Sequence, residues 1–267
     1  MSHEILLIGY GNMGAALAAG WVSTGVDAAT VAVTDARADA AAGVRSRGHV
    51  WLAETTAVRA GVVVVAVKPQ QLSACLEQHR TACRAAAVVL SIVAGKTLAD
   101  YATALGSDVA VVRAMPNTPA AIAEGATVLC ANAAVPAQWR ERCAELMRAV
   151  GRVHWVEDES LLDAVTAVSG SGPAYVFLFI ECLTAAGIDA GLPAALAADL
   201  ALQTVAGAAI YARGANVPLR RLRQQVTSPG GTTEAALERL LEGDRFSQLL
   251  KTAVAAATER SRTLSQR

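Results

Sequence analysis

The chain has 267 residues and no formal net charge, with 54% hydrophobic and 17% charged residues. This composition excludes a disordered chain, and the charge balance gives no reason to expect a nucleic-acid or membrane-surface partner. No apolar run reaches membrane-spanning length, and the N-terminus lacks a signal-peptide pattern, so we expect a cytoplasmic protein. The five cysteines and four histidines are scattered, which favours a metal-free protein whose cysteines are buried, reduced and hydrophobic in role.

The N-terminus predicts a dinucleotide-binding turn. Residues 4–8 form an apolar run typical of a buried parallel strand, Gly9-Tyr10-Gly11-Asn12-Met13-Gly14 follows, and residues 15–22 have a helical pattern. Gly-x-Gly-x-x-Gly between a strand and a helix is the fingerprint of dinucleotide binding. Gly9 permits a tight turn, Gly11 lets the backbone approach a pyrophosphate, and Gly14 allows the helix to pack closely on the strand.

The second predicted strand, residues 30–34, ends at Asp35. A carboxylate about 20 positions past the glycines usually accepts a hydrogen bond from the ribose 2′-OH of NAD and repels the 2′-phosphate of NADP. Arg37 lies two residues further on and is able to pair with that phosphate. The alternative for Asp35 is a loop carboxylate or a helix N-cap, so these residues leave the choice between NADH and NADPH open.

Strand and helix patterns alternate up to residue 156. Further strands are expected at residues 49–52, 61–67, 88–93, 109–113, 127–130 and 153–156, and helices at 36–47, 71–84, 97–105 and 137–150. This alternation predicts an α/β fold of Rossmann type over residues 1–158, with a mostly parallel sheet covered on both faces. Lys68 follows the clearest buried strand, at the sheet edge where such folds bind ligands. The alternative for Lys68 is a solvated strand end.

From residue 159 to residue 267 the pattern is helical throughout. Helices are expected at residues 160–168, 174–186, 194–213 and 234–241, with a glycine-rich interruption at 169–173. The helix over 194–213 is apolar almost all round and must therefore be buried on all sides. Because a small helical domain has little interior, we expect subunits to pack through it as an obligate oligomer. Polar interruptions argue against a membrane helix.

A second glycine-rich turn, Ser228-Pro229-Gly230-Gly231-Thr232-Thr233, precedes the last of these helices. The proline fixes φ, the glycines permit positive φ, and the threonines are suited to capping the helix. Such a turn presents backbone N–H groups at the positive end of a helix, which suits a carboxylate or a phosphate. On this stretch alone, an ordinary helix N-cap is an equal alternative.

Five motifs occur in a fixed order along the chain. They are the glycine fingerprint of residues 9–14, Ala66-Val67-Lys68-Pro69-Gln70, Met115-Pro116-Asn117-Thr118-Pro119, Val168-Ser169-Gly170-Ser171-Gly172-Pro173-Ala174-Tyr175 and Val226-Thr227 with the turn that follows. Through these motifs, over essentially its whole length, the chain resembles the pyrroline-5-carboxylate reductases. The resemblance implies reduction of Δ1-pyrroline-5-carboxylate to L-proline with NAD(P)H, the last step of proline biosynthesis. It also implies an all-α C-terminal domain, residues 159–267, that forms a homodimer, and dimers that often assemble into a decamer.

The resemblance assigns roles to residues of this chain. Together with Asp35 and Arg37, the expected cofactor-binding residues are Gly9, Gly11, Asn12, Met13, Gly14, Val67, Lys68, Pro69, Ala94, Gly95, Asn117, Thr118, Ser171, Gly172 and Pro173. The expected substrate-binding residues are Val226, Ser228, Gly231, Thr232 and Thr233. Thr233 is the expected catalytic residue, with its hydroxyl directed at the ring nitrogen of the substrate. No metal ligand is expected.

Two departures from the family bear on the cofactor. Ala53 stands where many members carry Asn or Asp in contact with a ribose, and Asp35 is unusual at the end of the second strand. We expect NADPH, with NADH as the alternative that Asp35 leaves open.

Two other functions share part of this sequence pattern. A β-hydroxyacid dehydrogenase shares the fingerprint but needs a catalytic lysine in the helical half, where Lys251 is the only lysine. A non-catalytic NAD(P)-binding sensor has no use for a small-acid turn at residues 228–233.

Overall fold

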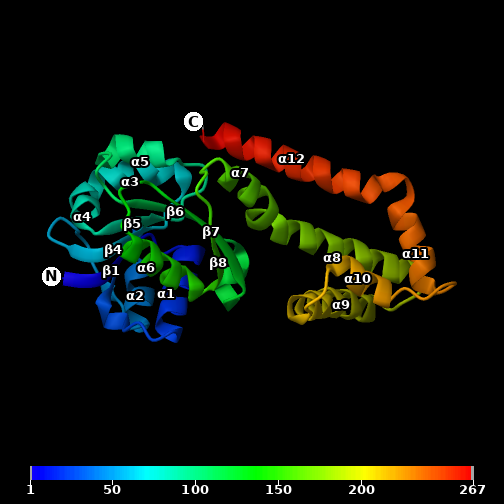
Figure 1. Cartoon of the computed structure of the whole chain (residues 1–267). Coiled ribbons are helices and arrows are strands. Elements are labelled where there is room, and N and C mark those ends of the chain that lie inside the picture. Colours follow the sequence, from blue (N-terminus) through cyan, green and yellow to red (C-terminus); the bar gives the residue numbers. More distant parts are fainter. Residues whose placement is uncertain (1, 266–267) are drawn as a thin grey trace. The chain divides into compact units, whose positions relative to one another are not determined.

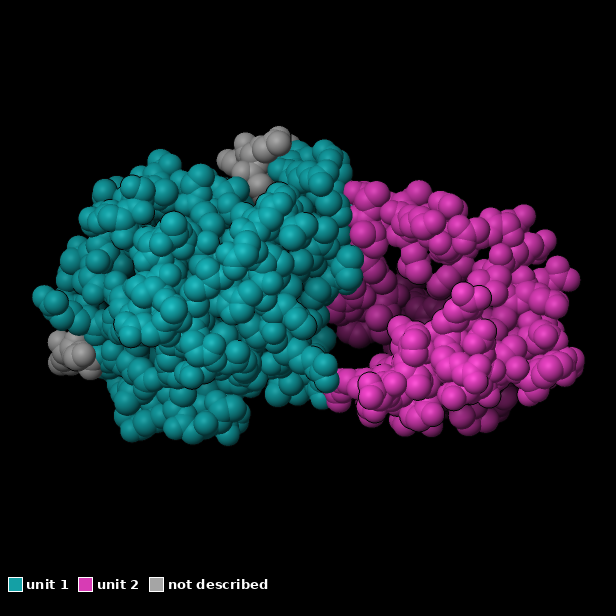
Figure 2. All heavy atoms as spheres, viewed as in Figure 1, with its two compact units in different colours: residues 1–171, 257–267 teal, residues 172–256 magenta. Residues whose placement is uncertain are grey.

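The computed structural model describes residues 2–265. The chain forms two compact units, which Figures 1 and 2 show in the same view. The first unit comprises Met1–Ser171 and Ala257–Arg267, and the second comprises Gly172–Ala256. The chain therefore leaves the first unit at residue 171 and returns to it near its C-terminus.

The first unit is built on one eight-stranded sheet in the order β3-β2-β1-β4-β5-β6-β7-β8. The strands are β1 (Ser2–Ile8), β2 (Val31–Thr34), β3 (Val50–Trp51), β4 (Arg59–Val65), β5 (Val88–Ser91), β6 (Val111–Met115), β7 (Gly125–Ala131) and β8 (Gly151–Trp155). Neighbouring strands pair in parallel except β6 and β7, which are antiparallel. The order from β3 to β6 is that of a Rossmann fold, whose ligands bind where the order reverses, here between β1 and β4. The predicted α/β class is confirmed.

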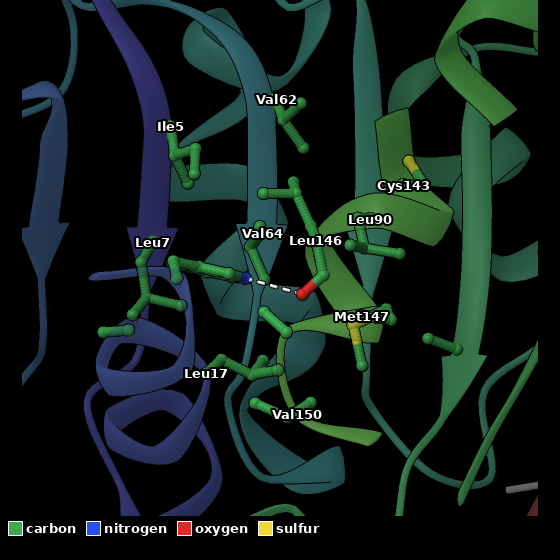
Figure 3. Packing of buried hydrophobic residues seen from close by; sticks show 14 of the residues in the cluster. Ile5, Leu7, Leu17, Val62, Val64, Leu90, Cys143, Leu146, Met147 and Val150 are labelled. Carbon is green, nitrogen blue, oxygen red and sulfur yellow. Dashed lines mark hydrogen bonds between the residues drawn. The ribbon is translucent and has the colours of Figure 1, made fainter. Parts of the chain in front are cut away.

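The sheet is packed on both faces because alternate strand residues point to opposite sides. Ile5 and Leu7 of β1 join the apolar cluster under helices α1 (Asn12–Ser23) and α6 (Ala137–Arg148). Figure 3 shows this cluster, in which the Trp21 indole N–H donates to the carbonyl oxygen of Leu146 at 2.9 Å. That bond satisfies the one polar group that Trp21 carries into the core.

The opposite face holds a second apolar cluster. Leu6 and Ile8 pack there under helices α3 (Leu72–Gln78), α4 (Arg80–Ala85) and α5 (Leu98–Leu105). The cluster continues through buried residues of β4, β5 and β6. Helices thus cover the sheet from both sides, as the alternating pattern predicts.

Two helix predictions in this unit are wrong in detail. The single helix expected at residues 71–84 is broken at His79, whose φ of −105° and ψ of 14° end α3 and precede α4. The His79 imidazole is buried and shares a 2.6 Å hydrogen bond with the hydroxyl of Thr55. This contact fixes the break from outside the helix. The helix expected at 36–47 is also shorter, since α2 spans Ala40–Ser46.

The passage into the second unit is helical throughout. Helix α7 (Leu161–Val165) continues into a π-helical turn (Thr166–Gly170), and α8 (Gly172–Asp189) follows. The Ser171 N–H donates to the carbonyl oxygen of Thr166 at 2.8 Å, the five-residue spacing of a π turn. The prediction that residues 169–173 interrupt the helix is therefore wrong. The chain stays helical there, because the wider π turn takes up one residue more than an α-helical turn.

The second unit contains α8, α9 (Ala194–Gly214), α10 (Leu219–Gln225), α11 (Thr232–Leu241) and most of α12 (Arg245–Ser265). Helices α8 and α9 approach closely at Gly187, where an added Cβ would lie 3.3 Å from the Cβ of Ala197. Large apolar side chains of this unit remain exposed, among them Phe177, Leu202 and Ile210. Such a surface needs a partner to cover it.

Two helical stretches, Leu161–Asp189 and Ala194–Gly214, are long and apolar enough to cross a membrane by length and composition alone. A helix that packs against another subunit has the same length and composition. The cysteines divide between the units: Cys75, Cys83, Cys130 and Cys143 are buried, whereas Cys182 on α8 is exposed. The expectation that all five are buried is wrong for Cys182, because α8 presents much of its surface outside the unit.

Candidate active site

The glycine fingerprint forms a turn between β1 and α1, and its three glycines meet three different needs. Gly9 has a φ of +100°, and an added Cβ there would lie 2.5 Å from the Ala66 carbonyl oxygen. A Cβ on Gly14 would lie 2.3 Å from the carbonyl oxygen of Gly9, whereas a Cβ on Gly11 would meet nothing within 4 Å. The fold itself therefore requires Gly9 and Gly14, and the space at Gly11 is open to a ligand.

Helix α1 begins directly after its N-cap residue, Gly11. Because glycine has no side chain, Gly11 offers no acceptor to the first N–H groups of the helix. Within residues 2–265, no hydrogen bond reaches the N–H groups of Asn12 and Met13. Unpaired N–H groups at a helix N-terminus form an anion site. This turn fits the pyrophosphate of a dinucleotide cofactor.

Asp35 lies at the end of β2 and is joined to the glycine turn. Its Oδ2 accepts a hydrogen bond from the Tyr10 N–H at 2.6 Å, and its Oδ1 accepts from the Arg37 N–H at 2.8 Å and from Arg37 Nε at 3.1 Å. Burial alone would raise the pKa of Asp35, but the bonds from Arg37 and Tyr10 outweigh it and hold the pKa below its usual value. The carboxylate is thus charged and engaged by the protein.

Two arginine side chains lie at this turn: Arg37 pairs with Asp35, and Arg47 contacts Tyr10. The Asp35 side chain is 9% exposed, whereas that of Arg37 is 60% exposed. Arg37 Nη2 also donates to the Tyr10 carbonyl oxygen at 3.1 Å. Arg47 donates to the Tyr10 hydroxyl at 3.1 Å, and its guanidinium carbon lies 5.9 Å from the centre of the Tyr10 ring. Two cations therefore lie beside the position expected for the cofactor ribose.

Lys68 and Pro69 follow β4 at the carboxyl edge of the sheet. The Lys68 backbone N–H donates to Gln71 Oε1 at 3.2 Å, and the Gln71 N–H donates to the Lys68 carbonyl oxygen at 2.9 Å. These reciprocal bonds close the turn and fix the Lys68 backbone. No ion pair or hydrogen bond of the Lys68 amine occurs among the described residues. The amine is thus available to a ligand.

Asn117 connects three segments of the first unit. Its Oδ1 accepts from the Ala126 N–H at 2.8 Å, and its Nδ2 donates to the Ser169 carbonyl oxygen at 3.2 Å. The carboxamide thereby joins the end of β6 to β7 and to the π-helical turn. Gly170 in that turn is packed closely, since an added Cβ would lie 2.7 Å from Cε of Met115. Asn117 therefore positions the backbone around Thr118 and Ser171.

The second glycine-rich turn belongs to the second unit and precedes α11. The Gly231 N–H donates to the Ser228 carbonyl oxygen at 3.0 Å, and Gly230 has a φ of +71°. Gly231 is the helix N-cap and α11 begins at Thr232, so the threonines occupy the first helical turn and do not cap it, contrary to expectation. No hydrogen bond reaches the N–H groups of Thr232 and Thr233 within the described part of the chain. A small carboxylate is able to bind there.

Comparisons with known proteins agree with this arrangement. Residues 159–264 match the family model described as pyrroline-5-carboxylate reductase dimerisation, and residues 4–95 match the model described as NADP oxidoreductase coenzyme F420-dependent. The chain is 41% identical to pyrroline-5-carboxylate reductase of Pseudomonas aeruginosa, over 98% of this chain and 97% of that protein. It is 40% identical to the enzyme of Mycobacterium tuberculosis, over 98% and 96%. The chain belongs to the pyrroline-5-carboxylate reductase family.

Solved structures place this reductase in the same family. A pyrroline-5-carboxylate reductase from Coxiella burnetii matches with a TM-score of 0.91 at 36% identity, over 98% of both chains. The Plasmodium falciparum pyrroline carboxylate reductase with NADP bound matches with a TM-score of 0.84 at 28% identity, again over 98% of both chains. The predictions of the family, the fold and an NAD(P)H-dependent oxidoreductase are confirmed. The match to a dimerisation model also confirms that the reductase self-associates.

Residues that the sequence analysis missed complete the picture of this reductase. Glu234 Oε2 accepts a hydrogen bond from the Gly230 N–H at 2.7 Å and closes the second turn. A glutamate at the third position of a helix is a known capping signal that could have identified it. Glu159 Oε1 accepts from the Leu98 N–H at 2.7 Å and from Arg113 Nη1 at 2.6 Å. No sequence signal indicates that contact, because it joins segments far apart in the chain.

Proposed function

We propose that this chain reduces Δ1-pyrroline-5-carboxylate to L-proline, with NADPH as the favoured hydride donor. One observation supports this above the others. In the region that matches the dimerisation model, the turn before α11 leaves the N–H groups of Thr232 and Thr233 without a partner among the described residues. A small acid that carries its own carboxylate is the ligand that suits this turn.

The substrate carboxylate binds at the N-terminus of α11. The Thr232 and Thr233 N–H groups donate to it, with Ser228 and Gly231 shaping the turn and Val226 covering the apolar ring. Thr233 directs its hydroxyl at the ring nitrogen and assists its protonation, directly or through water. The family resemblance implies these side-chain roles, and the unpaired N–H groups of the turn support the carboxylate contact.

The chemistry asks mainly for orientation. When bound, NADPH would supply the hydride that reduces the imine carbon of the substrate, and the C=N electron pair would pass to the protonated nitrogen to give the amine of proline. Holding the hydride-donating carbon and the imine carbon about 3–3.5 Å apart contributes about 7–11 kcal/mol to lowering the barrier. The nicotinamide half of the cofactor is lined by Val67, Pro69, Ala94, Gly95 and Thr118. Ser171, Gly172 and Pro173 form part of the wall between cofactor and substrate.

The polar residues of the first unit bind and select the cofactor. The N–H groups of Asn12 and Met13 hold the pyrophosphate, and Lys68 lines the nicotinamide half together with Val67 and Pro69. Arg37 supplies the cation for the 2′-phosphate, since its guanidinium is exposed while Asp35 is held by the Tyr10 N–H. NADH is the weaker donor, because Asp35 has little free acceptor capacity for a ribose hydroxyl.

The domain roles, assembly and compartment belong to the same proposal. Residues 1–158 bind the cofactor, and residues 159–267 bind the substrate and form the dimer through the apolar surfaces of α8 and α9. Decamers of such dimers follow the family pattern. We propose a cytoplasmic location for the enzyme.

The competing dehydrogenase function lacks support. Lys251, the lysine it would need, forms an ion pair with Asp244 at 3.7 Å on an exposed part of α12. The charge of Lys251 is thus paired with that of Asp244, and Lys251 lies outside the five family motifs.

The test is the oxidation of NADPH and NADH, measured in parallel, with pyrroline-5-carboxylate as acceptor. We expect turnover with a preference for NADPH, and at least about a tenfold loss of kcat/KM for Thr233→Ala, restored in part by Thr233→Ser. Thr252→Ala on α12 is the matched control, since its hydroxyl bonds within the helix to the carbonyl oxygen of Gln248 at 3.0 Å. Absence of turnover from a folded, self-associated protein would overturn the proposal.

A further inference from the structure

The C-terminal end of α12 belongs to the cofactor-binding unit. Residues 257–265 of this helix cluster with the sheet-containing unit, although residues 245–256 of the same helix belong to the second unit (Figure 2). Ser261 is only 6% exposed there, and its hydroxyl donates to Oδ1 of Asp163 on α7 at 2.6 Å. A partly buried, charge-assisted bond between residues 98 positions apart fixes the helix end in place.

The last turn of α12 lies against the loop that follows β5. Gly95 has a φ of +65°, and a Cβ placed on it would lie 3.4 Å from the Cβ of Leu264, 3.7 Å from its carbonyl carbon and 3.8 Å from its carbonyl oxygen. Gly95 has no Cβ, so Leu264 lies just beyond the space that a methyl group on Gly95 would fill, and the helix end limits how far the Gly95 backbone can move in that direction. Ala94 and Gly95 are among the residues that, under the proposed function, line the nicotinamide half of the cofactor.

The same loop is held from its other end. The N–H of Leu98, the first residue of α5, donates to Oε1 of Glu159 at 2.7 Å, and the same oxygen accepts from Arg113 at 2.6 Å. The Arg113 and Glu159 side chains are mostly buried, at 11% and 29% exposure. Residues 94–98 thus have a fixed end at Glu159, and Leu264 provides the second support at Gly95.

We propose that residues 257–264 of α12 are a brace for the cofactor loop, with Ser261 as the positioning residue that anchors the brace on Asp163. The inference rests on the proposed function, which places Ala94 and Gly95 at the nicotinamide. Without the brace, Gly95 keeps its turn but gains freedom to move away from the cofactor. A site that is loosened in this way binds its ligand less tightly even when every contacting residue is present.

The test compares NADPH affinity in three full-length variants. Ser261→Ala removes the anchor and Ser261→Thr retains the hydroxyl. Thr263→Ala is the matched control, because the Thr263 hydroxyl bonds within the helix to the carbonyl oxygen of Glu259 at 3.0 Å. The Kd for NADPH is measured by cofactor fluorescence without substrate, and kcat and KM are measured with pyrroline-5-carboxylate.

We expect Ser261→Ala to raise the Kd and KM for NADPH about fivefold, with the KM for pyrroline-5-carboxylate within about twofold of wild type. Ser261→Thr and Thr263→Ala retain wild-type Kd values. A role limited to stability would lower the melting temperature of Ser261→Ala and leave the Kd unchanged, which would overturn the inference. A wild-type chain that binds NADPH but does not reduce pyrroline-5-carboxylate would overturn the proposed substrate alone, and the Kd ratio would still decide this inference.

Discussion

The two glycine-rich turns, Gly9–Gly14 and Ser228–Thr233, use the same local design in different surroundings. Both precede a helix whose first N–H groups have no partner within residues 2–265. The first turn is packed against its own fold, since added Cβ atoms on Gly9 and Gly14 would lie 2.5 Å and 2.3 Å from backbone oxygens. At Gly230 of the second turn, an added Cβ would meet nothing within 4 Å. Packing therefore requires Gly9 and Gly14 of the first turn but not Gly11, and backbone conformation requires Gly230.

The difference indicates how each turn is kept in shape for its ligand. Tyr10, Asp35 and Arg37 tie the first turn to the next strand before any cofactor is present. The second turn is held by its own residues, through the Ser228 carbonyl oxygen and the Glu234 carboxylate. A preorganised cofactor site and a self-contained substrate turn should respond differently to the same kind of substitution.

The strongest test of this comparison replaces two glycines of the first turn, Gly11 and Gly14, with alanine one at a time. Gly14→Ala places a Cβ 2.3 Å from the Gly9 carbonyl oxygen, and overpacking of that kind costs about 1–3 kcal/mol of unfolding free energy. Gly11→Ala meets open space in the free protein and should change the unfolding free energy little, while blocking the pyrophosphate. Urea unfolding and NADPH titration measure the two effects. Equal destabilisation by both substitutions would contradict the assignment of Gly11 to the ligand.

A second test concerns the cofactor selected by the first turn. Arg37→Ala should lower the ratio of kcat/KM for NADPH to that for NADH about tenfold, because a charge-assisted bond to the 2′-phosphate is lost. Arg45→Ala, at an exposed arginine on α2, is the control. If the ratio is unchanged in Arg37→Ala, Arg47 beside Tyr10 is the next residue to substitute.

The second turn should respond to strain alone. Gly230→Ala forces a φ of +71° on a residue with a Cβ, which costs about 1–2 kcal/mol. We expect a severalfold higher KM for pyrroline-5-carboxylate and an unchanged Kd for NADPH. Gly243→Ala imposes similar strain, at a φ of +62°, elsewhere in the same unit and should leave this KM unaltered. A Kd for NADPH that rises with the KM would show that the two turns do not act separately.

The smallest expected effect is the dependence of the first unit's stability on pH. Burial lowers the pKa of His49 and of His79, so the neutral form is favoured in the folded chain. The unfolded chain binds more protons below its ordinary histidine pKa, and stability therefore decreases as pH falls below about 6.5. All four histidines and all four tryptophans precede residue 172. Tryptophan fluorescence in urea should show earlier unfolding at pH 5.5 than at pH 7.5, and His79→Gln should reduce that difference.

Much of the fold was predictable because its signals are local. The apolar runs of β1, β4 and β5 identify buried parallel strands, and Gly9, Gly11 and Gly14 have the spacing that a pyrophosphate turn needs. The motifs of the second half, above all residues 228–233, identify the family. The self-associating region follows from the apolar helix at 194–213, because a helix that is apolar on all faces has to be buried.

Other features depend on contacts between distant residues and carry no local signal. The break between α3 and α4 at His79 is stabilised by the hydrogen bond to Thr55. The π-helical turn Thr166–Gly170 keeps the chain helical in a stretch whose glycines predict an interruption. The helix over residues 245–265 was not expected, nor was the return of its end to the first unit.

The sequence by itself determined the fold class, the dinucleotide turn, the family and the reaction chemistry, because periodicity, glycine spacing and short motifs are properties of neighbouring residues. Tertiary structure alone decided how these parts are braced. It engaged Asp35 with Tyr10, joined Glu159 to Leu98 and Arg113, and set Leu264 against Gly95. Each of these contacts spans 25 or more positions along the chain, and its existence depends on the packed sheet that brings its members together.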